Sequence, residues 1–341
     1  MSHQVTIQPS GHQFTVKPGE TLLSAALNAG FSLPYGCRNG ACGACKGKIL
    51  AGAVDYGVFQ EGALSQEDKA QGLALFCCAK AETDLVIEVK EVGAARDIPI
   101  RTLPCRIEKM EKLAEDVMAL WLKLPSNERL QFLPGQYIDF LLKDGKRRSF
   151  SLANSPEEDA LLELHIRHVP GGQFTDHVFG AMKEKDILRI EGPYGSFYLR
   201  EDSPKPMVLL ASGTGFAPIK ALVEHMQFKR ITRPATLYWG GRRPEDLYLN
   251  AWVRAQVTAM PNLSYVPVVS DATPADAWTG RTGFVHRAVL QDFPDLSGHQ
   301  VYACGAPIVV DSARKDYTSL GGLPEDDFFA DSFTSEADKH P

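Results

Sequence analysis

Three cysteines and three glycines are concentrated in residues 34–46, PYGCRNGACGACK. Cys37, Cys42 and Cys45 have the spacing C-x₄-C-x₂-C. Thiolates at this spacing, completed by a distant fourth cysteine, are the ligands of plant-type [2Fe–2S] clusters. The intervening glycines allow backbone N–H groups to approach the cluster sulfides without obstruction by side chains. The loop therefore predicts an iron–sulfur site.

The fourth ligand must be one of the adjacent residues Cys77 and Cys78 in LFCCAKAETD. If this stretch is extended, the two side chains face opposite ways and only one can reach the site. Zinc is the alternative metal, but zinc sites usually pair two C-x₂-C knuckles and this chain has one. Most of the seven cysteines lie in these two stretches rather than along the whole chain, which indicates metal thiolates in a reducing cytoplasm rather than disulfides.

Length and composition limit the classes of protein that remain. A chain of 341 residues predicts two or three domains, and 44% hydrophobic with 23% charged residues is typical of a soluble globular protein. No apolar run reaches the roughly 18–20 residues of a membrane span, and the N-terminus lacks the features of a secretory signal. The net charge of −6 argues against nucleic-acid binding. We therefore expect a cytoplasmic protein.

The elements of residues 1–92 form a small α+β domain. Val5, Ile7, Phe14 and Val16 alternate across a turn and predict a hairpin, and the apolar spacing in 22–29 predicts a helix ending at Gly30. Strands are expected over 48–50 and 84–90. Residues 93–101 lack amphipathic periodicity and are interpreted as a linker.

The rest of the chain changes its pattern near residue 203. Six short alternating segments between 102 and 202 predict an antiparallel β-barrel. Residues 203–341 alternate apolar strands with helices and predict an α/β domain with a parallel sheet.

A glycine-rich turn begins this last domain. In ASGTGFAPIK, Gly213 and Gly215 precede a helix with Pro218 in its first turn. Such a turn can hold a pyrophosphate against the N–H groups of the helix. A tight strand-to-helix connection explains the glycines equally well, and the motif departs from G-x-G-x-x-G.

The motifs RRSFSLAN, GPYGSFYL, ASGTGFAP, ACGAP and FFADSF occur in this order, and together they resemble the ferredoxin–NADP reductase superfamily over residues 103–335. The first 92 residues resemble its β-grasp ferredoxin module, in which the fourth cysteine precedes the aspartate of the last strand by seven residues. Counting back from Asp84 gives Cys77 as the ligand and Cys78 as a buried neighbour.

The resemblance also implies roles for the flavin residues. Arg148 would neutralise the FAD pyrophosphate, Phe150 would pack on the flavin, and Ser151 would hydrogen-bond near its N5 atom. The family more often has tyrosine where this chain has Phe150. Alone, Arg148 is equally well interpreted as a surface charge at a strand end.

The nicotinamide side follows in the same way. Cys304 would lie against the nicotinamide, and Phe333 would be the terminal aromatic on the flavin, with Asp331 two positions earlier. Without the resemblance, Cys304 is a small buried residue and Phe333 a core aromatic. The implied catalytic residues are Ser151, Cys304 and Asp331. Gly172, Phe174 and Thr175 in PGGQFTDHV match the family's second flavin-phosphate stretch. The implied cofactor-binding set further includes Ser149, His165, Arg167, Gln173, Gly213, Thr214, Gly215, Pro218, Gly240, Arg242 and Gly305.

These parts predict one electron-transfer enzyme. NADH gives up two electrons as a hydride and a [2Fe–2S] cluster accepts one at a time, so FAD, which can do both, is expected between them. Arg242 and Arg243 could meet the 2′-phosphate of NADPH, but Glu245 and Asp246 follow, and we expect a preference for NADH.

The electron acceptor is expected to be a partner protein. GQYIDF, RIEGPYGSF, GTGFAPIK, YVPVVS, TGFVH and VYACG are very similar to iron–sulfur flavoproteins of the CDP-6-deoxy-3,4-glucoseen reductase type. Those enzymes reduce a sugar intermediate, derived from CDP-4-dehydro-6-deoxyglucose, that is held on a pyridoxamine-phosphate dehydrase. The alternatives are the reductase component of an aromatic-ring or phenol oxygenase, and a non-catalytic electron carrier.

Overall fold

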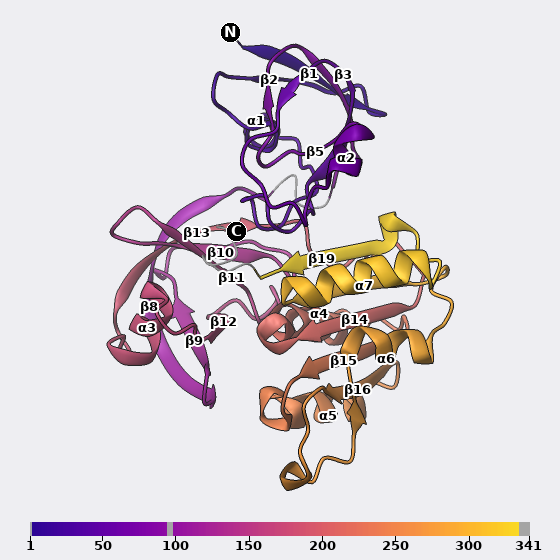
Figure 1. The fold of residues 1–341 in the computed structure, drawn as a ribbon. Coiled ribbons are helices and arrows are strands. Elements are labelled where there is room, and N and C mark those ends of the chain that lie inside the picture. The colour runs from indigo at the N-terminus through magenta and orange to yellow at the C-terminus, as the bar shows by residue number, and fades with distance from the viewer. Residues whose placement is uncertain (1, 94–97, 334–341) are drawn as a thin grey trace. The chain divides into compact units, whose positions relative to one another are not determined.

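The computed structural model describes residues 2–93 and 98–333 (Figure 1). The described residues form two compact units, one of residues 2–93 and 98 with 331–333, and one of residues 99–330. Residues 94–97 of the expected linker lie outside the described part of the chain.

The first unit contains a five-stranded sheet of order β2-β1-β7-β3-β5 and a two-stranded sheet of β4 and β6. The expected hairpin is confirmed, with Val5 opposite Phe14. The expected helix is also confirmed and is capped by the Thr21 hydroxyl, which accepts from the N–H of Ser24. The elements are β1 (His3–Gln8), β2 (Gln13–Val16), α1 (Leu22–Asn28), β3 (Lys46–Ala51), β4 (Val54–Asp55), α2 (Gln66–Ala70), β5 (Leu73–Leu75), β6 (Lys80–Ala81) and β7 (Leu85–Glu88).

The second unit begins with a six-stranded antiparallel sheet of order β11-β10-β13-β8-β9-β12. Each strand contains one of the six alternating segments expected from the sequence. An isolated antiparallel bridge between Leu152 and Leu164 connects the two edges of this sheet. The elements are β8 (Arg101–Ala114), β9 (Val117–Lys123), β10 (Tyr137–Leu141), β11 (Arg147–Ser151), β12 (Leu162–Arg167), α3 (Gln173–Gly180) and β13 (Ile187–Tyr194).

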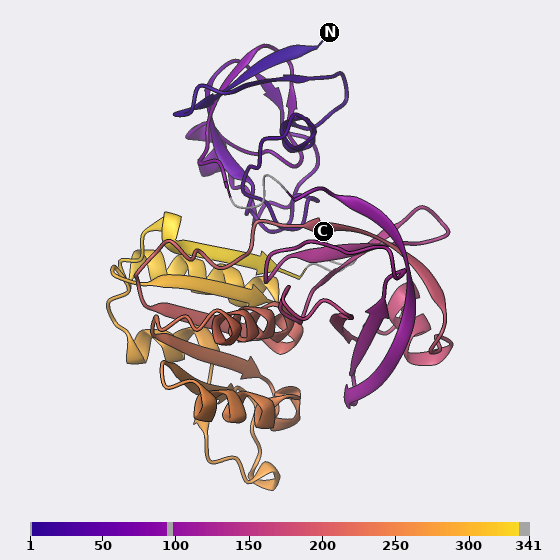
Figure 2. The same cartoon turned by 180° about the vertical axis from the view of Figure 1, so that it is seen from behind.

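A second six-stranded sheet follows, of order β17-β16-β15-β14-β18-β19, and its strands β14 to β18 pair in parallel as expected. Helices α6 and α7 cover the face seen in Figure 1, and α4 and α5 cover the face seen in Figure 2. The strands are β14 (Met207–Ser212), β15 (Ala235–Gly241), β16 (Leu263–Val269), β17 (Arg281–Thr282), β18 (Gln300–Gly305) and β19 (Phe328–Ser332). The helices are α4 (Phe216–Phe228), α5 (Asn250–Ala259), α6 (Val285–Asp292) and α7 (Pro307–Ser319), with short 3₁₀ turns η1 (Gly213–Gly215), η2 (Pro244–Asp246), η3 (Pro274–Asp276) and η4 (Glu325–Asp327).

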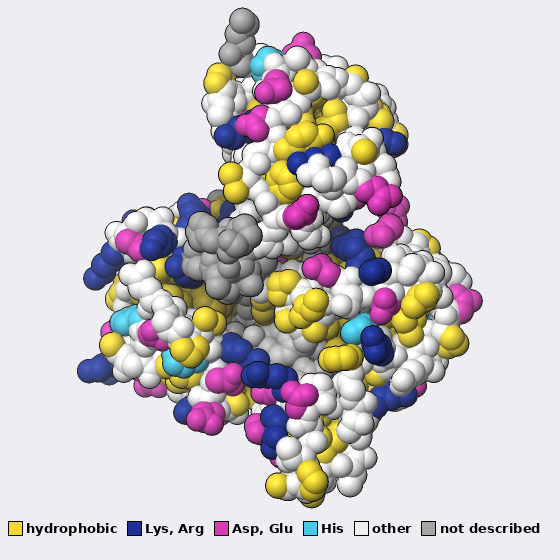
Figure 3. All heavy atoms as spheres, viewed as in Figure 1, with side chains coloured by type: hydrophobic (Ala, Val, Ile, Leu, Met, Phe, Trp, Pro, Cys, Tyr) yellow, Lys and Arg dark blue, Asp and Glu magenta, His cyan; other side chains and the backbone are white. Residues whose placement is uncertain are grey.

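The surface has no dominant sign of charge on the face that Figure 3 shows, where Lys and Arg are interspersed with Asp and Glu. Within residues 2–93 and 98–333, no helix combines the length and apolar character that crossing a membrane requires.

Candidate functional site

The four predicted cluster ligands lie in the first unit and interact as two pairs of thiols. Among residues 2–93 and 98–333, no group of three or more His, Cys, Asp or Glu side chains is arranged so that it could hold a metal ion. Cys37 and Cys42 form one pair, whose hydrogen bond lowers the pKa of Cys37 to about 6 and raises that of Cys42. Cys45 and Cys77 form the other, and their hydrogen bond raises the pKa of Cys77. The negative charge of ionised Cys37 also raises the pKa of Cys77, so the two pairs interact electrostatically. The fold therefore brings together the thiols of Cys45 and Cys77, which are 32 positions apart (77 − 45).

The loop around these sulfurs has the close backbone approach that a cluster requires. A Cβ atom on Gly36 would lie 3.2 Å from the Cys42 sulfur. Gly40 has a φ of +79°, and a Cβ there would lie 2.7 Å from the Cys78 sulfur and 2.9 Å from the Cα of Phe59. Three thiols in this glycine-rich loop, with Cys77 after β5, are soft donors of the type that a [2Fe–2S] group takes.

The expectation that Cys77 and Cys78 face opposite ways is wrong. Both lie in a turn after β5, in which the N–H of Cys78 donates to the carbonyl oxygen of Leu75 at 2.9 Å. Because the chain curls here instead of extending, the two sulfur atoms lie only 3.6 Å apart. Cys78 is buried, as expected, and the choice of Cys77 as the ligand stays a prediction.

The two stretches assigned to the flavin lie together in the second unit. The Phe150 ring packs against Phe174 of α3, with centroids 5.4 Å apart. Arg148 lies on the same face of β11 as Phe150, because side chains alternate along a strand. It is half-buried, and its Nη1 donates to the carbonyl oxygen of Arg147 at 2.8 Å. Arg148 is therefore placed on the side of the strand that meets α3.

The start of α3 has free donors. Gly172 caps the helix without a side-chain hydrogen bond, so the first N–H groups are open to an anion. The Thr175 hydroxyl is already used, because it donates to the carbonyl oxygen of Val169 at 2.9 Å. Phe174 is buried in the core of the antiparallel sheet, whereas Gln173 is exposed. An arginine on the strand face that meets α3, together with the uncapped start of that helix, is chemically suited to a dinucleotide pyrophosphate.

The glycine turn connects β14 with α4 as the sequence predicts. The indole N–H of Trp239 donates to the carbonyl oxygen of Gly213 at 3.0 Å and so fixes the turn. A Cβ on Gly215 would lie 2.2 Å from the carbonyl oxygen of Cys304, so only glycine allows the end of β18 to approach. The buried Cys304 therefore lies beside the turn, and this cradle fits a nucleotide phosphate.

The other predicted site residues have varied surroundings. Ser149 donates to Asp139 at 2.6 Å, and Ser151 is buried at the end of β11. Gly240 is required by packing, because a Cβ there would lie 2.7 Å from the Cβ of Val285. The side chain of Arg242 is exposed. The remaining members of the set occupy the following places: Thr214 is in η1, Pro218 is in the first turn of α4, Gly305 ends β18, Asp331 is buried in β19, and Phe333 is half-buried after it.

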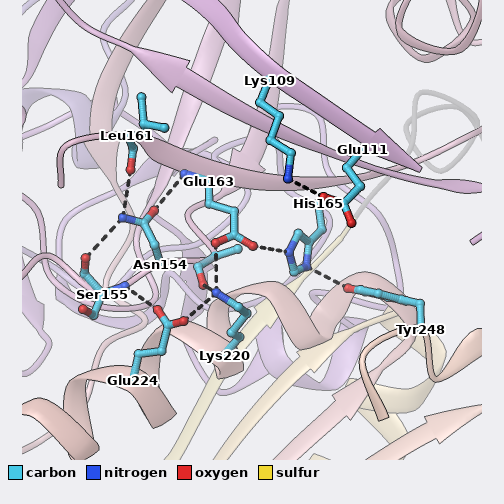
Figure 4. A network of polar contacts seen from close by, with 11 residues as sticks. Lys109, Glu111, Asn154, Ser155, Leu161, Glu163, His165, Lys220, Glu224 and Tyr248 are labelled. Carbon is cyan, nitrogen blue, oxygen red and sulfur yellow. Dashed lines mark hydrogen bonds and ion pairs between the residues drawn. The ribbon is translucent and has the colours of Figure 1, made fainter. Parts of the chain in front are cut away.

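A polar network that the sequence did not predict joins the two sheets of the second unit (Figure 4). Lys220 of α4 is only 7% exposed, and its Nζ donates to Glu163 of β12 at 2.9 Å and to Glu224 at 2.6 Å. Glu224 in turn accepts from the backbone N–H of Ser155 at 3.0 Å. The helix after the glycine turn is thereby attached to the antiparallel sheet.

His165 extends this network as a neutral group. Burial lowers the pKa of His165. Burial alone would raise the pKa of Glu163, but the hydrogen bond from His165 and the charge of Lys220 outweigh this effect and lower the pKa of Glu163. The ionised Glu163 must accept, so His165 donates to it through Nε2 at 2.9 Å. The Nδ1 atom of His165 is then free to accept from the Tyr248 hydroxyl at 3.0 Å.

Arg167 completes the junction beside the glycine turn. Its guanidinium pairs with Asp116 at 3.2 Å and with Asp246 at 3.7 Å. A Cβ on Gly213 would lie 3.0 Å from its Nη1 atom. His165 and Arg167 thus connect the predicted flavin and nucleotide regions, and a cofactor contact for either stays a prediction.

We expect Lys220→Met to destabilise the second unit by about 3–5 kcal/mol, because it leaves two largely shielded carboxylates, 12% and 22% exposed, without their buried cation. Denaturant unfolding followed by tryptophan fluorescence measures this, since all four tryptophans (121, 239, 252 and 278) lie in that unit. Lys229→Met, at the C-cap of the same helix, is the matched control, because Lys229 is 47% exposed and its Nζ lies 3.9 Å from Glu157. Its effect should stay within about 0.5 kcal/mol. Equal losses in both variants would contradict the role of the network.

One sequence signal for this network was available. Lys220 is a lone cation in the apolar helix FAPIKALVEHM and has Glu224 four positions later. Glu163 and Tyr248 have no such local signal.

Comparison with known proteins agrees with the three-part organisation. Residues 5–82 match the 2Fe-2S iron-sulfur cluster binding domain, 104–198 the oxidoreductase FAD-binding domain, and 209–315 the oxidoreductase NAD-binding domain.

Whole-length relatives are also found. The chain is 42% identical to a CDP-6-deoxy-L-threo-D-glycero-4-hexulose-3-dehydrase reductase of Yersinia pestis, covering 98% of this chain and 99% of the relative. It is 36% identical to reductase component 2 of terephthalate 1,2-dioxygenase from Comamonas sp, covering 100% of both. The crystal structure of the Amycolatopsis cytochrome P450 reductase GcoB matches with a TM-score of 0.78 and 34% identity, over 98% of this chain and 99% of that one.

Proposed function

We propose that this chain, a member of the [2Fe–2S] ferredoxin-reductase-type flavoproteins, supplies electrons from NADH to a sugar-deoxygenating partner. The proteins of this family are oxidoreductases with FAD- and NAD-binding domains. The partner would be a pyridoxamine-phosphate dehydrase that holds an intermediate derived from CDP-4-dehydro-6-deoxyglucose. The observation that supports this choice is the 42% identity over 98% of the chain with a hexulose-3-dehydrase reductase.

The proposed roles of the residues follow from their places. Cys37, Cys42, Cys45 and Cys77 would hold the cluster, and the uncapped start of α3 with Arg148 would neutralise the FAD pyrophosphate. The η1 turn would hold the nicotinamide nucleotide, with Cys304 beside it. FAD supplies the chemistry that converts a hydride into single electrons. The chain's own task is to position these groups, and Ser151 and Asp331 are proposed to act at the flavin.

We also propose the finer organisation of the chain. A β-grasp ferredoxin domain would span residues 1–92, a linker 93–101, a closed FAD-binding barrel 102–202 and the nucleotide domain 203–341. The bridge between Leu152 and Leu164 supports closure of the barrel. A reducing, cytoplasmic location is proposed because none of the seven cysteines, all of which lie in the described part of the chain, forms a disulfide bond.

A second candidate is the reductase component of an aromatic-ring oxygenase, which the 36% identity to a terephthalate dioxygenase reductase favours. Reconstitution separates the two. The purified protein with NADH should support turnover by a hexulose-3-dehydrase loaded with its CDP-sugar, and should support a terephthalate dioxygenase oxygenase component much more slowly. The reverse order of rates would overturn the sugar assignment, and no NADH oxidation with any acceptor would favour a simple electron carrier.

A further inference from the structure

Two arginines follow β15, next to the η1 turn that is proposed to hold the nucleotide. Gly240 of β15 pairs with Ser212 of β14, just before the η1 turn, so Arg242 and Arg243 leave the sheet beside that turn. In dinucleotide-binding sheets, residues near this edge meet the adenosine ribose, and an arginine there accommodates the 2′-phosphate of NADP. The sequence RR would by itself favour NADPH.

In the structure, Arg243 is paired with the carboxylate of Asp276. Its Nη2 donates to Oδ1 of Asp276 at 2.6 Å and to the hydroxyl of Thr273 at 3.3 Å. The Asp276 side chain is only 11% exposed, whereas that of Arg243 is 37% exposed. The partly exposed cation is therefore paired with a carboxylate that is itself largely shielded.

Asp276 is itself held in place. Its Oδ2 accepts from the N–H of Thr273 at 2.6 Å and from the Thr273 hydroxyl at 2.9 Å, which caps the η3 turn. The two loops are also joined by their backbones, because the N–H of Asp271 donates to the carbonyl oxygen of Arg242 at 2.8 Å. Arg243 can turn toward a ligand only by leaving this fixed carboxylate unpaired.

We propose that Asp276 determines nucleotide specificity by holding Arg243 and so denying a 2′-phosphate its cation. This inference rests on the proposed use of a nicotinamide nucleotide. Asp276 is a positioning residue, since it acts through Arg243. Arg242 is kept in every variant described below, so it does not contribute to the differences in nucleotide binding between them.

The test uses the holoprotein and measures binding of ADP-ribose and of 2′-phospho-ADP-ribose by calorimetry. Asp276→Asn keeps an oxygen that can accept from Thr273 but removes the charge. We expect it to tighten binding of the 2′-phosphorylated compound roughly tenfold, the value of one charge-assisted hydrogen bond, and to leave ADP-ribose unchanged. The ratio of kcat/KM for NADPH to that for NADH should rise by a similar factor. Asp276→Ser provides the same test if the asparagine variant folds poorly.

Two further variants separate the mechanism from a general charge effect. Adding Arg243→Gln to Asp276→Asn should abolish the gain. Glu245→Gln removes a neighbouring carboxylate that is 69% exposed and 3.9 Å from Arg243, and it should change the ratio less than about twofold. An unchanged preference in Asp276→Asn, or a gain that survives loss of Arg243, would overturn the proposal. Failure of the wild-type protein to bind ADP-ribose would instead overturn the proposed function, and this inference with it.

Discussion

A Cys42→Ser protein is expected to oxidise NADH with ferricyanide at close to the wild-type rate but to lose reduction of cytochrome c and of a dehydrase partner. Cys42 is a buried cysteine of the first unit. The predicted flavin and nucleotide residues lie in the second unit, with the exception of Asp331 and Phe333. Loss of the one-electron exit should therefore spare hydride acceptance. Steady-state assays with the two acceptors measure the contrast.

Cys105→Ala is a suitable control for this experiment. Cys105 is equally a buried free cysteine, but it belongs to the core of the antiparallel sheet. It should reduce both acceptors at rates near wild type. If Cys42→Ser reduced cytochrome c at the wild-type rate, electrons would be leaving without the cysteine loop, and the proposed order of transfer would be wrong.

The second large effect concerns the adjacent cysteines. Cys77→Ser is expected to lose the cluster, so that anaerobically purified protein contains almost no iron and shows no rhombic EPR signal after reduction. Cys78→Ser should retain about two irons per chain and the signal. The reason is that the Cys77 thiol hydrogen-bonds with Cys45, whereas the hydrogen bond of Cys78 is with Cys77.

This pair of variants is its own matched control, because both remove one buried sulfur and the two sulfurs lie 3.6 Å apart. The opposite pattern would assign the fourth ligand to Cys78. Zinc instead of iron in the wild-type protein would reject the iron–sulfur site altogether.

Much of the fold could be predicted because its signals are local. The alternation of Val5 and Ile7 against Phe14 and Val16 needs only the two-residue period of a strand, and the hairpin forms as expected. The same period located all six strands of the antiparallel sheet. Glycines in ASGTGFAP marked a tight turn, and the structure has a 3₁₀ turn there. The helix α3 was not predicted, because its residues were interpreted only as a phosphate motif.

The candidate site was predictable where spacing alone specifies chemistry. C-x₄-C-x₂-C restricts the metal group, and the match of residues 5–82 to a 2Fe-2S binding domain agrees with it. The turn at Cys77 and Cys78 was not predictable, since whether two adjacent side chains diverge or converge depends on how the chain curls after β5.

The sequence by itself determined the ligand types, the strand periods and the order of the three motifs, because each depends on neighbours along the chain. Only the tertiary structure decided which charges meet. Lys220 and Glu163 are 57 positions apart, and Arg243 and Asp276 are 33 apart, so packing of whole elements chooses these partners. A buried or shielded charge is favourable only beside its counter-charge, and that neighbour exists only after folding. Arg243, which the sequence indicates as a possible phosphate ligand, is paired with Asp276 in the folded protein.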